Sequence, residues 1–521
     1  MDSYLSYDAV VVVIALLFLL YTFGKRRSYP DFLLPPGPRA LPIIGNAHQF
    51  GSRSPQEVFD DLAQEWGGIA YLRIFGAPLV VVSSARVARE LTETHSRSTS
   101  DRPQLVLFTE LMDFSNDMVI MRYGDRWRRH RRWIQDILQN KKEVFDLSAM
   151  QREGTIRLLK SLLESPDAFR THIKIWSAEM MMKLAYGFEI TTTDDKRLKL
   201  VEEVLEASSD TSALAVTLMD VFPMVKYIPK WFPGAGFKRK ALHVSAVRHR
   251  VQDSLQQEIK QAMMSGSAKP SMTSRLLESA SGELEKEAEW DIKGVANVLY
   301  LGGSETSASA LTAFFLAMVL YPEVYAKAQQ EVDEVIGRDR LPDPADRSSL
   351  PYMECILKEL FRWACPVPLG IPHSLMDDCQ YNQFRLPGGS KLIFNQWAMT
   401  RDETIYPSPD EFIPERFQSD ENGLKGMEPV EDPRGIVFGF GRRICPGRHM
   451  ADNSVWLAIV TVTAMLSISK AVAADGKEIL PVPTVPSRPD PIRSYEEFKC
   501  IIRPRSQAIV TTIMQADLRR A

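Results

Sequence analysis

A long apolar segment with a polar centre constrains the fold of this chain more than any other feature. The segment runs from Val295 to Tyr321 as VANVLYLGGSETSASALTAFFLAMVLY. Its length suits a membrane span, but Ser304, Glu305 and Thr306 lie near its middle, where ionisable groups are most costly in lipid. A helix that is apolar on all sides and stays out of lipid must be surrounded by protein. The sequence therefore predicts a long helix in the core of a large domain.

The rest of the chain has the pattern of helices with a few short strands. Apolar residues recur at intervals of three and four in two long stretches, which predicts helices within 155–186 and 242–263. A run rich in β-branched residues around a Gly-Ala-Pro turn predicts a hairpin at 69–82. Later strands are expected at 391–394, at 498–503 and, as a return strand, at 508–514. The predicted fold class is mainly α with small peripheral β-sheets.

The composition excludes several classes of protein. The chain has 521 residues, of which 45% are hydrophobic and 25% charged, as is ordinary for a globular protein with a large core. A net charge of -3 gives no overall basic field, so we expect no nucleic-acid partner. The five cysteines are too few and too irregularly spaced for a disulfide framework or a paired zinc site, and they favour a reducing compartment. They are Cys355, Cys365, Cys379, Cys445 and Cys500.

The N-terminus predicts a membrane anchor. Residues 9–24 carry no charge and are followed at once by Lys25, Arg26 and Arg27. A cleaved signal peptide has its positive charges before the apolar run, whereas positive charges after it keep the remainder of the chain cytosolic. A buried helix is the alternative. We expect an anchor at 1–24, a basic and proline-rich hinge at 25–45, and one globular domain at 46–521.

The stretch VFGFGRRICPGRHMAD, residues 437–452, raises the question of why it carries a cysteine. Most intracellular cysteines are small buried hydrophobes, which is the plain interpretation of Cys445. However, Pro446 suits the first position of a helix, which would place Cys445 at or just before a helix N-terminus. Unpaired N–H groups there, with Arg442, Arg443 and Arg448 nearby, would favour the thiolate, and a thiolate is a metal ligand. Glycines at 439, 441 and 447 would let the backbone pass close to a large flat group.

The spacing Phe438-x-x-Gly441-x-Arg443-x-Cys445-x-Gly447 resembles the haem-binding signature of the cytochrome P450 family. The resemblance implies haem b as cofactor, with Cys445 as the axial ligand of its iron and Phe438, Gly441 and Gly447 against the ring. A thiolate ligand donates electron density to the iron and favours cleavage of the O–O bond. The implied fold is a triangular prism with haem between the long central helix and the cysteine loop.

Gly302-Gly303-Ser304-Glu305-Thr306 resembles the oxygen-activation motif of the same family. The resemblance implies that Glu305 and Thr306 are catalytic and relay protons. Close packing against another helix is the alternative explanation for the glycine pair, since each glycine costs up to about 1 kcal/mol in a helix interior.

Glu359 and Arg362 lie three residues apart and so on one helix face, where their simplest role is an exposed ion pair worth less than about 1 kcal/mol. With the later PERF motif they resemble the buried Glu-Arg-Arg network of the family, which implies that Arg416 completes it.

Four residues match contacts of the family to the haem propionates: Trp127, Arg131, His373 and Arg443. Trp127 and Arg131 are an i,i+4 pair on one helix face. A basic surface helix is the alternative, and we expect Arg128, Arg129 and Arg132 to be solvated. His373 has the alternative of an ordinary core histidine.

The resemblance spans residues 35–505 and is strongest to fungal microsomal enzymes of secondary metabolism. It implies a monooxygenase of the endoplasmic reticulum membrane, single-pass, with its catalytic domain cytosolic. Its partners would be an NADPH–cytochrome P450 reductase, cytochrome b5 as a second donor, and a lipophilic substrate such as a terpenoid or polyketide. A haem-thiolate isomerase or dehydratase, and a non-catalytic haem protein, are the alternatives. Candidate pocket segments are 108–119, 299–303, a strand at 367–371, and 492–495.

Overall fold

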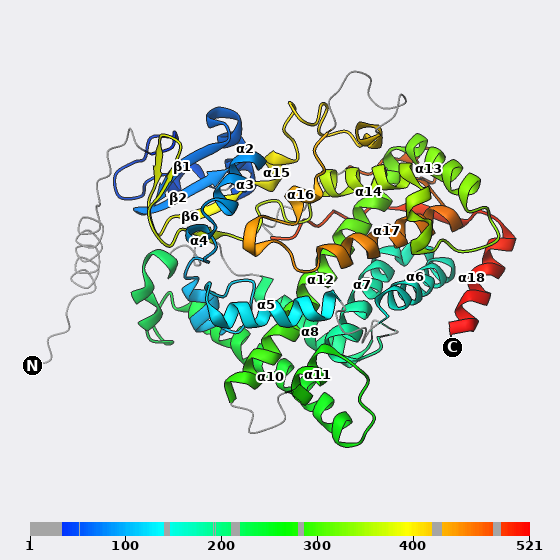
Figure 1. Ribbon diagram of the computed structural model, residues 1–521, viewed down its shortest axis with the longest axis horizontal. Helices are drawn as coiled ribbons and strands as arrows, with labels where there is room; N and C mark the ends of the chain where they lie inside the picture. Colours follow the sequence, from blue (N-terminus) through cyan, green and yellow to red (C-terminus); the bar gives the residue numbers. More distant parts are fainter. Residues whose placement is uncertain are drawn as a thin grey trace, which may run out of the picture. The chain divides into compact units, whose positions relative to one another are not determined.

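The computed structural model describes residues 34–51, 53–139, 146–190, 192, 194–209, 219–279, 286–418, 430–482 and 491–520. The chain forms two compact units (Figure 1). The first unit contains residues up to 103 together with 369–399 and 440–443. The second unit contains residues 104–368, 400–439 and 444–521. The predicted anchor at 1–24, and the hinge as far as residue 33, lie outside the described residues.

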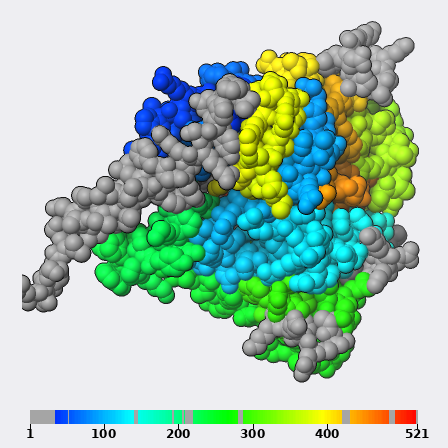
Figure 2. Space-filling view, turned by 60° about the vertical axis from the view of Figure 1, so that its left-hand side comes forward, coloured from blue at the N-terminus to red at the C-terminus, as the bar shows by residue number. Residues whose placement is uncertain are grey.

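The first unit is built on a four-stranded sheet of order β1-β2-β6-β3. β1 (Ile69–Ile74) and β2 (Ala77–Val82) pair antiparallel from Ile69↔Val82 to Ile74↔Ala77, which confirms the predicted hairpin. β6 (Lys391–Phe394) has the predicted bounds, and it pairs parallel with β2 and antiparallel with β3 (His373–Ser374). In Figure 2 the yellow surface of this later segment lies beside the blue surface of the early chain.

Short helices and a two-stranded ribbon complete the first unit. α2 begins with a capping box, because Ser54 accepts the Glu57 N–H while the Glu57 carboxylate accepts the Ser54 N–H. The remaining elements are η2 (Ala47–Gln49), α2 (Pro55–Trp66), α3 (Ala85–Glu93), α4 (Ser96–Thr99), β4 (Cys379–Tyr381), β5 (Phe384–Leu386), α15 (Gln396–Met399) and η8 (Gly441–Arg443).

The described part of the proline-rich segment lies along the edge strand β1. The N–H of Tyr71 donates to the carbonyl of Pro36 at 2.9 Å, and the N–H of Asn46 donates to the carbonyl of Arg73 at 2.6 Å. Gly37 contacts the backbone of Tyr71 so closely that a side chain would collide with its carbonyl group. Residues 36–46 are therefore attached to the first unit by backbone hydrogen bonds.

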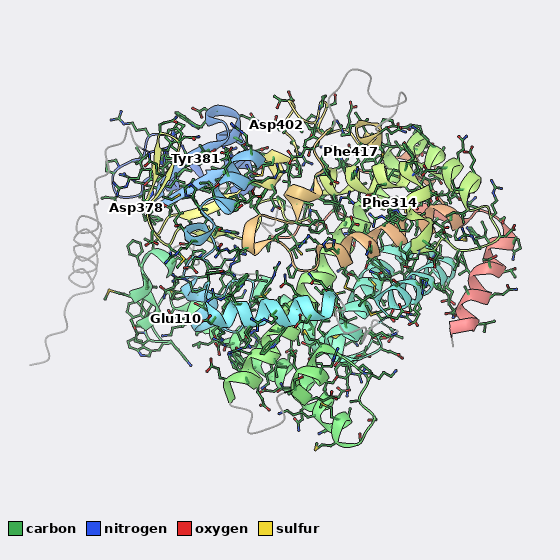
Figure 3. All side chains as sticks on the ribbon, viewed as in Figure 1. Glu110, Phe314, Asp378, Tyr381, Asp402 and Phe417 are labelled. Atoms are coloured by element: carbon green, nitrogen blue, oxygen red, sulfur yellow. The ribbon has the colours of Figure 1, made fainter. Side chains whose placement is uncertain are left out.

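The second unit is mostly helical and has α12 (Lys286–Leu320) at its core. Among the described residues one helix, 287–320 within α12, is long and apolar enough to cross a membrane, and 78% of its most apolar stretch is buried in the protein. Phe314, labelled in Figure 3, is fully buried and contacts Phe315 and Tyr325 edge-on. Burial of α12 in protein agrees with the prediction, although its glycine pair does not interrupt the helix.

The second unit contains further helices and short strands, and Figure 1 labels most of these helices. The predicted helix within 155–186 is two helices, α6 and α7, separated by a turn at Pro166. The elements are η3 (Leu107–Leu111), α5 (Asp125–Leu138), α6 (Leu147–Glu164), η4 (Pro166–Ala168), α7 (Phe169–Tyr186), α8 (Lys196–Ser209), η5 (Pro223–Tyr227), α10 (Gly236–Met264), α11 (Met272–Ser279), α13 (Pro322–Val335), η6 (Pro344–Ser349), α14 (Pro351–Ala364), η7 (Pro414–Phe417), α16 (Arg434–Val437), α17 (Arg448–Met465), β7 (Leu466–Val472), β8 (Glu478–Ile479), β9 (Cys500–Pro504) and α18 (Gln507–Arg520).

Two strand predictions are wrong. Residues 508–514 belong to the helix α18, in which Ile509 and Ile513, spaced as i,i+4, are fully buried, while Asp517 pairs with Lys160 of α6 at 2.8 Å. Tertiary packing of one helix face thus overrides the β-branched composition that suggested a strand. Residues 367–371 form a turn, since the sheet begins only at His373.

Candidate functional site

The backbone around Cys445 forms a closed loop before α17. The N–H of Cys445 donates to the carbonyl of Phe438 at 2.8 Å, and the Phe438 ring packs edge-on against Phe361 at 5.2 Å. α17 begins at Arg448 with Gly447 as its N-cap, so Pro446 lies outside the helix rather than at its first position. The N–H groups of Gly447 and Arg448 nevertheless point at the Cys445 sulfur. The helix N-terminus therefore supplies two donors to the thiol, as the sequence predicted.

The charge environment of Cys445 differs in part from the expectation. Burial raises the pKa of the thiol, while the two N–H groups and the guanidiniums of Arg131 and Arg448 act to lower that pKa. Arg448 acts on the thiol as expected, and Arg131 of α5 is a further cation near the sulfur that the sequence does not indicate. Since burial dominates, a bound cation would be needed to keep the thiolate form at neutral pH.

α5 brings two of the expected site residues together in the second unit. Trp127 and Arg131 are one turn apart and are both buried, with exposed fractions of 5% and 8%. No described residue accepts a hydrogen bond from the Arg131 guanidinium, and burial lowers its pKa. A buried guanidinium without an acceptor is costly, so this geometry fits an anionic group that is not part of the chain.

The first unit holds two buried guanidiniums, those of Arg102 and Arg443, with His373 close to them. The Nε of Arg443 donates to the Ser100 carbonyl at 2.7 Å, and Arg102 donates through Nη1 to the carbonyls of Ile371 and Pro372. Burial, with the positive charge of Arg443 as the second cause, lowers the pKa of Arg102 well below its usual value. These two guanidiniums therefore repel each other in a buried place, where the buried carboxylate of Asp101 acts in the opposite direction on Arg102, and a further anion beside the pair would be stabilised.

His373 is buried and its Nδ1 lies 2.8 Å from the carbonyl of Thr99. Burial and the charges of Arg102 and Arg443 lower the pKa of His373 well below its usual value, so the ring is neutral with its proton on Nδ1. The other nitrogen, Nε2, is then an acceptor. His373 can donate from Nε2 only when an adjacent anion favours the protonated ring.

The glycines of the cysteine loop have different structural roles. Gly441 has a φ of +57° in the left-handed region, and a side chain there would lie 2.7 Å from the Cβ of Thr92. Packing against α3 therefore requires this glycine, which gives Gly441 a structural role besides the one expected against a flat group. Gly447 would tolerate a side chain, since the nearest atoms are at 3.8 Å, one of them the Cys445 sulfur.

The polar centre of α12 has a packed face and an open face. A side chain at Gly303 would lie only 2.9 Å from the Cγ of Met181, whereas nothing lies within 4 Å of the same position on Gly302. Thr306 lies one turn after Gly302 and donates from Oγ1 to its carbonyl at 2.8 Å. Helix packing thus accounts for Gly303. Gly302 and Thr306 lie on the face of the helix that no other described residue covers at Gly302.

Glu359 and Arg362 form a buried network with Arg416 in the second unit. The Glu359 carboxylate accepts from Nε and Nη2 of Arg362 at 2.7 and 2.8 Å and from Nε of Arg416 at 3.2 Å. All three side chains are at most 3% exposed, so an exposed ion pair does not describe them. The remaining N–H groups of both arginines donate to backbone carbonyls between 400 and 411.

Comparison with known proteins identifies the family. A family profile described as Cytochrome P450 matches residues 35–479. This chain belongs to the cytochrome P450 family. It is 40% identical to "Cytochrome P450 monooxygenase 176" of Postia placenta, over 98% of this chain and 97% of that protein. It is 39% identical to "Cytochrome P450 monooxygenase 136" of the same fungus, over 99% and 97%. It is also 35% identical to "Cytochrome P450 monooxygenase claR" of Ampulloclitocybe clavipes, over 95% and 90%. The chain is thus an enzyme of the cytochrome P450 monooxygenase class.

Sequence reasoning missed two residues of this cytochrome P450. Arg102 lies in the stretch SDRP, which matches no motif. Asp291 lies near the start of α12, where acidic residues are common in any helix. Asp291 is fully buried and pairs with Arg126 and Arg129. Arg128, Arg129 and Arg132 are all exposed, as expected, although Arg128 pairs with Asp125 and Arg129 pairs with Asp291.

Proposed function

We propose that this cytochrome P450 is a haem b monooxygenase that oxidises a lipophilic small molecule. The observation that carries the proposal is the Cys445 sulfur, which receives two N–H groups while the acceptor-free Arg131 guanidinium lies nearby. Haem ligated by a thiolate supplies reductive activation of O2, and insertion of one oxygen atom into a C–H bond is the expected outcome. The chain's own residues would bind the cofactor and move protons.

The residues have separate roles in this proposal. Cys445 would be the iron ligand, with Phe438, Gly441 and Gly447 forming its loop. Trp127, Arg131, His373 and Arg443 would pair with the haem carboxylates, and Arg102 joins them because it shares a buried region with Arg443. Glu305 and Thr306 would move protons, and Glu359, Arg362 and Arg416 would hold the backbone of 400–411 in place.

A haem-thiolate isomerase or dehydratase is the second candidate, since it would use the same thiolate without O2. The polar centre of α12 favours the monooxygenase, because Glu305 and Thr306 are partly exposed beside the unobstructed Gly302, where an acid and a hydroxyl could deliver protons. A haem protein without catalysis would not need polar residues at this point of a buried helix.

Three finer points extend the proposal. Electrons would come from NADPH through a membrane-bound reductase, with cytochrome b5 as a second donor. The apolar run at 9–24 would anchor the enzyme in the endoplasmic reticulum membrane with the globular part in the cytosol. A terpenoid or polyketide of secondary metabolism would be the substrate, and the similarity to fungal monooxygenases supports the reaction class.

The reduced protein under carbon monoxide tests the ligand. We expect the absorption band of a thiolate-ligated haem from the wild-type protein and its loss from Cys445→Ser, because a hydroxyl donates far less electron density than a thiolate. A thiolate-type band in Cys445→Ser would refute the assignment. Dependence of product formation on both NADPH with reductase and O2 then separates the monooxygenase from the isomerase. Product profiling in a host that expresses the enzyme with a reductase would identify the substrate class.

A further inference from the structure

Asp291 lies in the second turn of α12, where its carboxylate accepts hydrogen bonds from two arginines of α5 and lies beside a third side chain of that helix, His130. Arg126 donates to Oδ1 from Nε at 2.8 Å and from Nη2 at 2.6 Å. Arg129 donates to Oδ2, and Nε2 of His130 lies 3.2 Å from the same oxygen. The carboxylate is fully buried, and these donors keep its pKa well below its usual range although burial acts in the opposite direction.

The three side chains that surround the carboxylate, Arg126, Arg129 and His130, define one face of α5. They occupy positions i, i+3 and i+4, which are neighbours on a helix surface. Trp127 and Arg131 each follow one of these residues directly, so they lie about 100° further round the helix. A carboxylate that holds the first face therefore fixes the rotation of α5 and, with it, the direction of Trp127 and Arg131.

The start of α12 is itself held in place. The side-chain amide of Asn116 donates to the carbonyl of Trp290 at 2.6 Å. A side chain at Gly294 would lie 2.6 Å from the Cγ of Asn116, so the loop before α5 packs directly on this turn. Asp291 is thus attached to a rigid element and not to a movable one.

Net stability does not explain why a charge is buried here. Arg126 and Arg129 have side chains that are 33% and 45% exposed and could be hydrated without a partner, whereas the carboxylate is wholly removed from water. Replacing a buried ion pair by apolar residues is often neutral or stabilising. What the carboxylate adds over an apolar contact is directional hydrogen bonding.

We propose that Asp291 is a positioning residue, whose carboxylate sets the rotation of α5 and thereby directs Trp127 and Arg131 to a haem carboxylate. The inference rests on the proposed function, since it concerns the residues that would hold haem. It predicts an effect of Asp291 on haem retention that runs through Arg131, beyond any effect on folding.

The test uses the full-length haem-loaded protein and follows haem transfer to excess apomyoglobin by the change in the Soret band. Asp291→Asn keeps the side-chain size but offers one acceptor oxygen and no charge to Arg126 and Arg129, and we expect haem loss about tenfold faster, as for other outer partners of a bound metal group. Arg126→Gln removes one donor from a partly exposed position, so it provides a milder variant if Asp291→Asn folds poorly. We expect about threefold faster loss from it, a smaller effect of the same kind.

Glu179→Gln is the matched control, because Glu179 is a buried carboxylate, 2% exposed, that pairs with Arg157 between α6 and α7. We expect it to lower the thermal midpoint of the haem-free protein without accelerating haem loss. Equal acceleration in both variants would mean general destabilisation and would overturn the proposal.

The double variant Asp291→Asn/Arg131→Gln decides whether the effect runs through Arg131. If the effect runs through Arg131, the acceleration of haem loss in the double variant is smaller than the product of the accelerations in the two single variants. Full multiplication of the two effects, or a wild-type rate for Asp291→Asn, would refute the positioning role. A wild-type protein that takes up no haem at all would instead refute the proposed function.

Discussion

The sulfur of Met181 on α7 lies directly against Gly303 of α12, while the neighbouring Gly302 faces open space. A methyl group added at Gly303 would collide with Met181, and the same group at Gly302 would touch nothing within 4 Å. Ser177, one turn before Met181, donates to the Ser304 carbonyl at 2.6 Å. α7 therefore packs on one side of the polar centre of α12 and leaves the other side free.

This relationship predicts opposite effects of two alanine substitutions. Gly303→Ala should lower the free energy of unfolding by up to about 2 kcal/mol, because displacing the Met181 side chain costs about 1–3 kcal/mol and the higher helix propensity of alanine offsets up to about 1 kcal/mol of it. Gly302→Ala should raise it by up to about 1 kcal/mol, because alanine has the higher helix propensity. Urea denaturation of the haem-free protein, followed by circular dichroism, measures both. Equal destabilisation would show that the two glycines share one packing role.

Thr306→Ala should uncouple electron consumption from product formation. Without the hydroxyl, protons are delivered less well, and more NADPH electrons should leave as hydrogen peroxide. The measurements are product and peroxide formed per NADPH with a true substrate present. Thr312→Ala is the control, since Thr312 makes the same hydrogen bond to a carbonyl one turn earlier, at 2.8 Å, in a buried part of the same helix. Unchanged coupling in Thr306→Ala would contradict the proton-delivery role.

Glu359→Gln should destabilise the protein strongly, because it leaves the buried guanidiniums of Arg362 and Arg416 without their carboxylate. Breaking a buried ion network in this way costs about 3–5 kcal/mol. Glu189→Gln is the comparison. Its carboxylate, 51% exposed, pairs with the exposed Lys269 at 2.8 Å, and an exposed pair is worth less than about 1 kcal/mol. Similar shifts of the urea midpoint in both variants would show that the Glu359 network adds no special stability.

Reversing Arg128 and Arg132 to glutamate should slow reductase-supported turnover and flatten its decline with added salt. Both side chains are exposed on α5, and attraction between exposed charges is screened over about 8–10 Å at physiological salt. Arg129 is left unchanged because it pairs with Asp291.

Peroxide-driven turnover of the Arg128 and Arg132 variant should change little, since it needs no electron donor. Lys174 and Lys196 are exposed on α7 and α8, and reversing them gives the same change of charge at another place. Equal losses with peroxide and with reductase would assign the two arginines of α5 to the fold instead of to the partner.

Features that depend on local sequence could be predicted, and features that depend on distant partners could not. The strand at 391–394 and the hairpin at 69–82 follow from short-range patterns of β-branched residues and a turn. The strand prediction for 508–514 is wrong because the sequence does not show which residues of this segment are buried. In the structure Ile509 and Ile513, on one face of α18, are buried against the second unit. Local pattern and tertiary packing disagree there, and packing decides.

The same distinction holds for the site. Cys445 and its glycines stand out because their spacing resembles the family signature and their loop is continuous in sequence. Arg102 could not, because its charge matters only beside Arg443, which follows it by more than three hundred residues. The role of Asp291 could not be predicted either, because it depends on the contacts of Asp291 with α5. The helix start at Arg448, two residues after Pro446, depends on backbone geometry that the proline permits but does not require.

The parallel pairing of β2 with β6 has a consequence for synthesis of the protein. The Asn395 side chain, just after β6, donates to the Phe59 carbonyl across 336 residues of sequence. At about 5–20 residues per second, the hairpin of β1 and β2 would leave the ribosome roughly 20–60 seconds before its partner strand exists. During that time the edge of β2 is an unpaired strand edge, which is prone to wrong pairing with other chains. The nascent chain is therefore expected to need a chaperone on this edge, and slower translation between the two strands would lower the yield of folded enzyme.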